Sequence, residues 1–263
     1  MVKDELSNYR PISNLSLISK IIERVVKSRL SDHLTSNNLI NPHQSGYCKH
    51  HSTETALLII HDHLINAIGS RKISCLCLLD LSAAFDVTDH NILLTCLSSW
   101  SGIHGTALNW FRSYLSSHSF RVKCNNDFSS IHTCLCGVPQ GSVLGPLLFV
   151  VYTTALSTLV SSLSLNHHLY ADDTQLFPFP LLSSTRLPLQ HQSLTKCSTT
   201  YLSWMTANLL GLNSSKTEFL LIGLKQQLYK IQDCSLTATH SARKPWFYFR
   251  RTPYLLGSNH CTF

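Results

Sequence analysis

The stretch Leu169-Tyr170-Ala171-Asp172-Asp173-Thr174-Gln175-Leu176-Phe177 sets two adjacent aspartates between two short apolar segments. Residues 171–174 are predicted to form a hairpin turn, and residues 175–177 the returning strand. Neighbouring carboxylates repel each other, so this turn is costly unless something cationic binds there. A lone Asp-Asp pair is more often a solvated turn, and its meaning therefore depends on what lies beside it.

A third acid ends another apolar segment. Residues 73–79 (Ile-Ser-Cys-Leu-Cys-Leu-Leu) predict a buried strand that delivers Asp80 at its end. If Asp80 meets Asp172 and Asp173 at one sheet edge, the three carboxylates form a site for hard divalent cations, which prefer oxygen ligands. Two such ions about 3.5–4 Å apart promote in-line attack on a phosphoryl group.

The rest of the chain mixes helical and strand patterns. One helix is predicted after Ser13, and a second from an N-cap at Ser52 to Gly69. Helical periodicity returns at 91–115 and again from Pro146, with short strands at 120–124 and 131–135. This mixture predicts an α+β fold with helices on one face of the sheet. In the first helix, the inward residues are expected to be Ile18, Ile21, Ile22, Val25, Val26 and Leu30, and the outward residues Lys20, Glu23, Arg24 and Lys27.

Composition and the N-terminal sequence limit the class of binding partner and the cellular compartment that we expect. The net charge of +7 favours an anionic partner but does not separate nucleic acid from an acidic membrane surface. The N-terminal residues are charged and lack an apolar signal segment, so we expect an intracellular protein that is not secreted; nucleus and cytoplasm both stay open. Gly145-Pro146 and Thr153-Thr154 interrupt the apolar stretch 143–160, which favours a buried helix and no membrane span.

Five ordered motifs carry a resemblance to a known family. They are Arg10-Pro11-Ile12-Ser13, Asp80-Leu81-Ser82-Ala83-Ala84-Phe85-Asp86, Gly137-Val138-Pro139-Gln140-Gly141-Ser142, Tyr170-Ala171-Asp172-Asp173 and Leu212-Asn213-Ser214-Ser215-Lys216-Thr217. Over residues 6–224 the chain resembles the reverse transcriptase domain of non-LTR (LINE-type) retrotransposons.

The resemblance implies a polymerase right-hand fold with fingers and palm, in which helices back an antiparallel palm sheet. The expected organisation is a fingers portion at 1–72, a palm-centred core at 73–224 with part of the fingers near 113–136, and an aberrant, poorly ordered tail at 225–263. The thumb is expected to be absent, as is the upstream endonuclease of such elements.

The resemblance also implies an RNA-directed DNA polymerase that adds dNTPs to a DNA primer on an RNA template. Asp80 and Asp172 would hold two Mg²⁺ ions, and Asp173 would be a supporting ligand. Lys216 resembles the lysine that protonates the departing pyrophosphate; an exposed turn lysine is the alternative interpretation.

A further set of residues is expected to meet the nucleotide. Phe85 resembles the aromatic gate that excludes a 2′-hydroxyl, although an ordinary core phenylalanine explains it nearly as well. Lys20 and Arg24 equally fit the solvated face of their helix. The whole nucleotide-binding set is Arg10, Lys20, Arg24, Leu81, Phe85, Gln140, Gly141, Tyr170 and Ala171.

Two departures from the family favour a catalytically inactive remnant that only binds nucleic acid. Gly46-Tyr47-Cys48 stands where the family usually has Gly-Phe-Arg, so a basic contact is lost. After Arg243 the chain departs from the expected primer-grip sequence, as a shifted reading frame would make it. An RNA-dependent RNA polymerase is a third interpretation, against which Phe85 argues. The histidine pairs lack partners at metal-ligand spacing and are expected to be structural or exposed.

Overall fold

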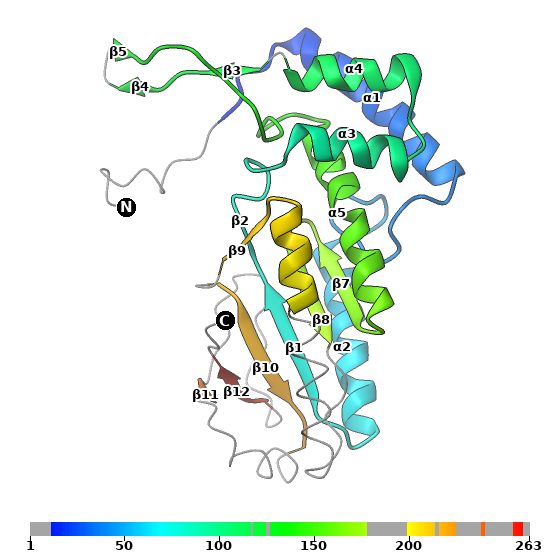
Figure 1. Cartoon of the computed structure of the whole chain (residues 1–263). Helices are drawn as coiled ribbons and strands as arrows, with labels where there is room; N and C mark the ends of the chain where they lie inside the picture. Colours follow the sequence, from blue (N-terminus) through cyan, green and yellow to red (C-terminus); the bar gives the residue numbers. More distant parts are fainter. Residues whose placement is uncertain are drawn as a thin grey trace. The chain divides into compact units, whose positions relative to one another are not determined.

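The computed structural model describes residues 12–116, 118–124, 127–177, 199–213, 216–224, 238–239 and 255–259. The chain divides into two compact units (Figure 1): unit 1 comprises residues 1–40 and 83–153, and unit 2 comprises residues 41–82 and 154–263. Residues 41–72 therefore group with the sheet and not with the first helix, so the compact units divide at other points than the predicted fingers and palm. The fingers and palm boundaries stay predictions.

Unit 2 is built on a sheet in which every described strand pair is antiparallel. Its central strand is buried on both faces, which explains the nearly continuous apolar run of residues 73–79. The spatial order is β11 (Ala238–Thr239), β12 (Leu255–Asn259), β10 (Glu218–Ile222), β1 (Ser74–Leu79), β8 (Asp173–Phe177) and β7 (Asn166–Tyr170). The predicted strand and the predicted hairpin are thus confirmed, but the turn is shorter than the predicted 171–174, because β8 already begins at Asp173.

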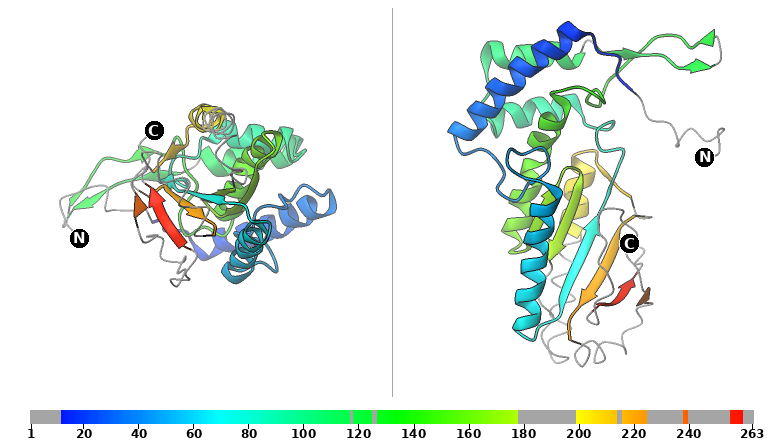
Figure 2. Two further views of the ribbon diagram at one scale, coloured as in Figure 1. Left: turned by 90° about the horizontal axis from the view of Figure 1, so that it is seen from below. Right: turned by 180° about the vertical axis from the view of Figure 1, so that it is seen from behind.

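Helices lie on both faces of this sheet (Figures 1 and 2), so the prediction of helices on one face is wrong. Helix α2 (Thr53–Gly69) covers one face, and the helical residues 199–207, yellow in Figures 1 and 2, cover the other. The Ser52 side chain accepts from the backbone N–H of Thr55, so the predicted N-cap is confirmed. The core between α2 and the sheet holds Ile60, Leu64, Leu76, Leu78, Phe177, Leu220 and Ile222, with Leu57 and Ile68 packed against it.

Unit 1 is mainly helical among its described residues. It contains α1 (Leu17–Ser36), α3 (His90–Ser99), α4 (Gly105–Ser116) and the first part of α5 (Gly145–Ser162). The helical pattern predicted at 91–115 is two helices, because the chain turns at Gly102 with φ +66°. The predicted strands near 120 and 132 form a narrow ribbon, in which β3 (Ser119–Phe120) pairs with β6 (His132–Thr133) and β4 (Lys123–Cys124) with β5 (Asp127–Phe128).

The prediction of which face of α1 points inward is wrong. Ile18 is 71% exposed and Val25 52%, whereas Glu23, which was expected to face solvent, is 1% exposed. The cause is a polar anchor that hydropathy does not reveal: the Glu23 carboxylate accepts from the backbone N–H of Val143 at 2.6 Å and from the Tyr114 hydroxyl at 3.0 Å. Burial and the Glu23 carboxylate raise the pKa of Tyr114. Of the six residues expected inward, only Leu30 is fully buried; Ile21 and Ile22 are exposed and Val26 is half-buried.

Helix α5 confirms the predicted helix after the Gly145-Pro146 break, with Pro146 in its first turn. By length and composition it could also cross a membrane, but 61% of its apolar window is buried inside the protein. That burial is typical of a core helix.

Only two short pieces of the predicted tail are described. Strands β11 and β12 pair with each other, and β12 pairs with β10. The other residues of 225–263 lie outside the described part of the chain, so the expected aberrant tail stays a prediction.

Candidate active site

The register of the sheet brings the predicted carboxylates to one end of unit 2. Strand β1 pairs with β8, and the last pair of this antiparallel register is Leu79 with Thr174, so that Asp80 directly follows and Asp173 directly precedes that pair in the sequence. The β7–β8 hairpin pairs Tyr170 with Asp173 and closes through the turn that contains Asp172. The register thus brings the end of β1 to the start of β8, while the meeting of the three carboxylates at one metal site stays a prediction.

The hairpin turn owes its shape to an unusual backbone conformation. Ala171 has φ +56°, the left-handed region that residues with a Cβ adopt only under constraint. This conformation reverses the chain between β7 and β8 and presents the two aspartates in succession.

Lys216 lies at the same end of the sheet. Its Nζ is 3.6 Å from Asp80 Oδ2, and the lysine side chain is 57% exposed against 15% for the aspartate. The backbone holds this arrangement, because the N–H of Asn213 donates to the carbonyl of Asp80 at 2.9 Å. An exposed ion pair of this kind adds little stability. The lysine is thus placed beside the carboxylates, while its predicted role as a proton donor stays a prediction.

Tyr47 belongs to the site but was not among the predicted site residues. Burial raises the pKa of its phenol, and the Asp172 carboxylate and Tyr170 add to that rise, which places the ring near both. Tyr47 is 49% exposed, so part of the ring is open to solvent. One feature of the sequence pointed to this position, namely the departure from the family at Gly46-Tyr47-Cys48.

Leu81, another predicted nucleotide contact, is 5% exposed. It lies in β2 (Leu81–Ser82), which pairs with β9 (Gly211–Leu212). Any contact from this residue to a nucleotide would have to come from its backbone.

In unit 1 the predicted nucleotide residues Phe85 and Gln140 lie on two segments that are tied together. The N–H of Val138 donates to the Phe85 carbonyl at 2.8 Å, and Gln140 Nε2 donates to Asp86 Oδ1 at 2.7 Å. Gly137 has φ +87°, and a Cβ there would lie 2.8 Å from the Asp86 carbonyl oxygen, so glycine is required.

The surroundings of Phe85 fit both of its interpretations. The ring is half-buried, and its centroid lies 4.7 Å from that of Phe149.

Gly141, with φ +89°, has open space where a Cβ would stand. Lys20 is half-buried and Arg24 exposed, whereas Arg10 lies outside the described residues.

The oxygen donors of the three predicted aspartates are of the type that Mg²⁺ prefers, but the described residues show no metal site. Within the described residues no three His, Cys, Asp or Glu side chains form a ready-made metal cage. Mg²⁺ commonly keeps several waters and is held by one or two carboxylates together with substrate phosphates, so it needs no such cage. The hard oxygen donors of Asp80, Asp172 and Asp173 match that chemistry.

The buried histidine pair of β7 is structural, as predicted. His167 Nε2 lies 2.7 Å from Ser157 Oγ, and His168 lies 2.9 Å from Ser45 Oγ and 3.0 Å from Gln175 Oε1. Burial, with His43 nearby, lowers the pKa of His167 to about 4, so the ring is neutral at pH 7.

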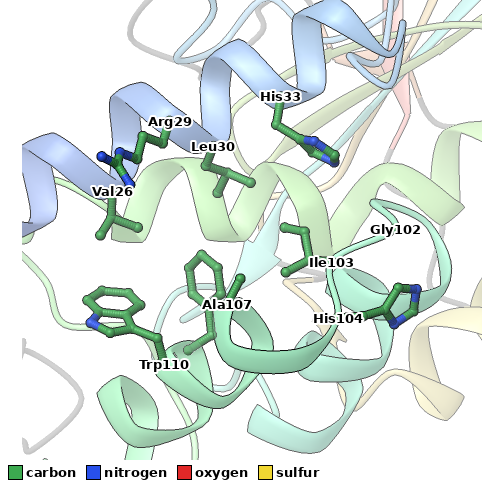
Figure 3. A pocket seen from close by; sticks show the side chains of 10 residues that line it. Val26, Arg29, Leu30, His33, Gly102, Ile103, His104, Ala107 and Trp110 are labelled. Atoms are coloured by element: carbon green, nitrogen blue, oxygen red, sulfur yellow. The ribbon is translucent and has the colours of Figure 1, made fainter.

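Unit 1 also holds an apolar pocket of about 390 Å³ (Figure 3). Residues of α1, among them Leu30, line one side, and Ile103 and Trp110 belong to the other. The pocket contains none of the predicted site residues.

Comparison with known proteins shows the family of this chain. The family model "Reverse transcriptase (RNA-dependent DNA polymerase)" matches residues 2–249. The chain is 31% identical over 217 residues to the probable RNA-directed DNA polymerase from transposon BS of Drosophila melanogaster, a match that covers 80% of this chain and 23% of the relative. It is 32% identical over 154 residues to the probable RNA-directed DNA polymerase from transposon X-element of the same organism, covering 57% of this chain and 16% of the relative.

A solved structure shares the fold. Apo telomerase from Candida tropicalis, truncated from its C-terminal domain, aligns with a TM-score of 0.53 at 13% identity, covering 76% of this chain and 40% of that one. The chain spans about a quarter or less of the length of the two curated relatives. Its matched residues, its right-hand polymerase fold and its transposon relatives confirm the predicted family: the chain belongs to the reverse transcriptase family, as a domain of the LINE type.

Proposed function

We propose that this chain is the catalytic domain of an RNA-directed DNA polymerase that copies a retrotransposon RNA. The observation that carries the proposal is the strand register that pairs Leu79 with Thr174, because Asp80 directly follows Leu79 and Thr174 is preceded by Asp173 and the turn that holds Asp172. The primer–template and the dNTPs are the proposed substrates, and the positive net charge of +7 suits these polyanions.

Reverse transcriptases generally use divalent metal ions. In this chain Asp80 and Asp172 would hold two Mg²⁺ ions, with Asp173 as a supporting ligand. The ions would make the primer 3′-hydroxyl more acidic and neutralise the charge of the triphosphate. Lys216, beside Asp80, would donate a proton to the departing pyrophosphate. Phe85 would exclude a ribose 2′-hydroxyl, and Gln140 would lie against the incoming nucleotide.

Purified protein tests this proposal with dTTP, Mg²⁺ and a poly(rA)/oligo(dT) primer–template. The expected result is Mg²⁺-dependent incorporation. In Asp172→Asn the rate should fall at least about 1,000-fold, because a proposed metal ligand is lost and each loss of about 1.4 kcal/mol in transition-state stabilisation lowers the rate tenfold. The matched control is Asp62→Asn, which changes an exposed acid of α2 and should retain activity.

The loss of the basic residue at Cys48 favours a second candidate, an inactive remnant that only binds nucleic acid. It predicts no incorporation by the wild-type chain, together with primer–template binding that weakens steeply with salt and persists in Asp172→Asn. Incorporation of ribonucleotides in preference to dTTP would instead identify an RNA polymerase and remove Phe85 from its proposed role.

A further inference from the structure

A short segment ahead of α2 covers the edge of the catalytic hairpin. The N–H of Leu169 donates to the His43 carbonyl at 2.8 Å, and the N–H of Ser45 donates to the Leu169 carbonyl at 2.9 Å. These bonds form a parallel bridge between Gln44 and Leu169 on β7, the edge strand of the sheet. The segment 43–46 therefore continues the sheet beyond its last strand, next to the turn.

The Gln44 side chain reaches from this segment into the turn. Its Oε1 accepts from the N–H of Ala171 at 3.0 Å and from the N–H of Gly46 at 2.7 Å. Its Nε2 donates to the Ala171 carbonyl at 3.2 Å. Gln44 is 2% exposed, so little water competes for these bonds. One amide thus holds both polar groups of the residue that adopts the left-handed conformation.

Gly46 allows the close approach that this arrangement needs. A Cβ on Gly46 would lie 2.2 Å from the backbone nitrogen of Ala171 and 2.8 Å from its Cα. Both contacts are with backbone, which cannot move aside as a flexible side chain could. No L side chain fits there without displacing the turn.

We infer that Gln44, with the space provided by Gly46, is a positioning residue that fixes the Ala171 peptide and thereby aims the aspartates that follow it. This inference rests on the proposed function. The peptide between Ala171 and Asp172 is held through the Ala171 carbonyl, so a rotation that would swing Asp172 away must first break the bond from Gln44. The residue acts on the metal ligands through the backbone and touches no substrate.

The chemistry of the side chain matters as well as its reach. The primary amide offers an acceptor for the two N–H groups and a donor for the carbonyl from one planar group without a change of charge or protonation. A glutamate would set a carboxylate against the Ala171 carbonyl and add negative charge near the site. An asparagine keeps the amide but is one methylene too short.

The test uses the full chain without nucleic acid, and it measures hydrogen exchange in peptides spanning 166–177 and Mn²⁺ binding from the EPR signal of the free ion. In Gln44→Met we expect exchange in the hairpin to be about tenfold faster. Mn²⁺ affinity should weaken by about tenfold or more, as it does when partners that orient metal ligands are removed. Exchange in peptides spanning α2 should not change.

Gly46→Ala should reproduce both effects, whereas Gly69→Ala should show neither, because nothing lies within 4 Å of a Cβ at Gly69. If Gln44→Met does not fold, Gln44→Asn asks the same question with a milder change. In an active wild type, the Mg²⁺ concentration for half-maximal incorporation should rise about tenfold in Gln44→Met. Metal-free affinity for primer–template should stay within about twofold, since the change does not touch that surface.

The outcomes separate the two proposals. Unchanged Mn²⁺ affinity in Gln44→Met overturns the inference, even if exchange quickens, because the residue would then be structural only. A wild-type chain that binds no Mn²⁺ overturns the metal site of the proposed function instead. Weakened Mn²⁺ binding in a chain that never polymerises supports the positioning role and counts against the polymerase.

Discussion

Glu23 in unit 1 and Asp80 in unit 2 are both acids on mainly apolar segments, yet their surroundings differ. Glu23 is 1% exposed, and fixed donors of Val143, Leu144 and Tyr114 surround its carboxylate. The Asp80 side chain is 15% exposed and forms an ion pair with the more exposed ammonium of Lys216, at the end of the sheet that leads into the Asp172–Asp173 turn.

The difference shows how burial and donors decide the use of a carboxylate. A buried acid satisfied by rigid N–H and O–H donors stabilises the structure, because its removal leaves those donors unpaired. An acid that converges with other acids is a poor stabiliser but a good ligand for a cation. The comparison predicts that substitutions in the two regions affect different measurements.

The largest expected effect is on activity. Asp80→Asn should lower Mg²⁺-dependent incorporation by about 1,000-fold or more, since the amide is a weaker ligand for a hard cation. Its free energy of unfolding should change little or increase, because repulsion from the neighbouring acids is relieved. Parallel activity assays and urea titrations check this; a variant that loses both activity and stability would place Asp80 in the same class as Glu23.

The next effect is on stability. Glu23→Ala should lower the free energy of unfolding by about 3 kcal/mol, because it leaves the Val143 and Leu144 N–H groups and the Tyr114 hydroxyl without their acceptor. Glu23→Gln keeps one acceptor oxygen and should cost roughly half as much. Urea denaturation gives both values. An alanine variant as stable as the wild type would break the contrast between the two acids.

The buried base His167 in unit 2 predicts a pH dependence of stability. The folded pKa of His167 is about 4, below its usual value of 6.5, so the folded state binds fewer protons than the unfolded state between these values. The contribution of His167 to the free energy of unfolding is therefore fully present above about pH 6.5. It falls by on the order of 2 kcal/mol as the pH drops towards 4. His167→Gln should flatten this slope relative to the exposed control His61→Gln. Unfolding curves across this pH range measure it, and equal slopes would contradict the burial argument.

The smallest expected effect concerns α1. Ile18→Ala should change the free energy of unfolding by less than about 0.5 kcal/mol, because the side chain is 71% exposed. Leu30→Ala on the same helix, where the side chain is 4% exposed, should cost about 3 kcal/mol. Thermal or urea unfolding of the pair shows which face is inward. Equal losses in the free energy of unfolding would support the inward face that apolar periodicity predicts.

Sequence determined most of unit 2 and its candidate site. The strand ending at Asp80, the Asp172–Asp173 hairpin and the Ser52 N-cap depend on neighbouring residues and on patterns of burial, turns and caps, which are local properties readable from the chain. The approach of the ends of β1 and β8 was predictable because a motif order shared with a known family supplied the topology.

Tertiary structure alone decided the orientation of α1 and the support of the hairpin. Apolar periodicity chose the wrong face of α1, because a single buried carboxylate bonded to backbone N–H groups more than a hundred positions away outweighs a stripe of isoleucines. In the same way, Gln44 meets Ala171 across 127 positions, and nothing in its local sequence reveals that its amide fits that peptide. Hydrogen bonds of this kind depend on distances between elements, which a local pattern of residues does not contain.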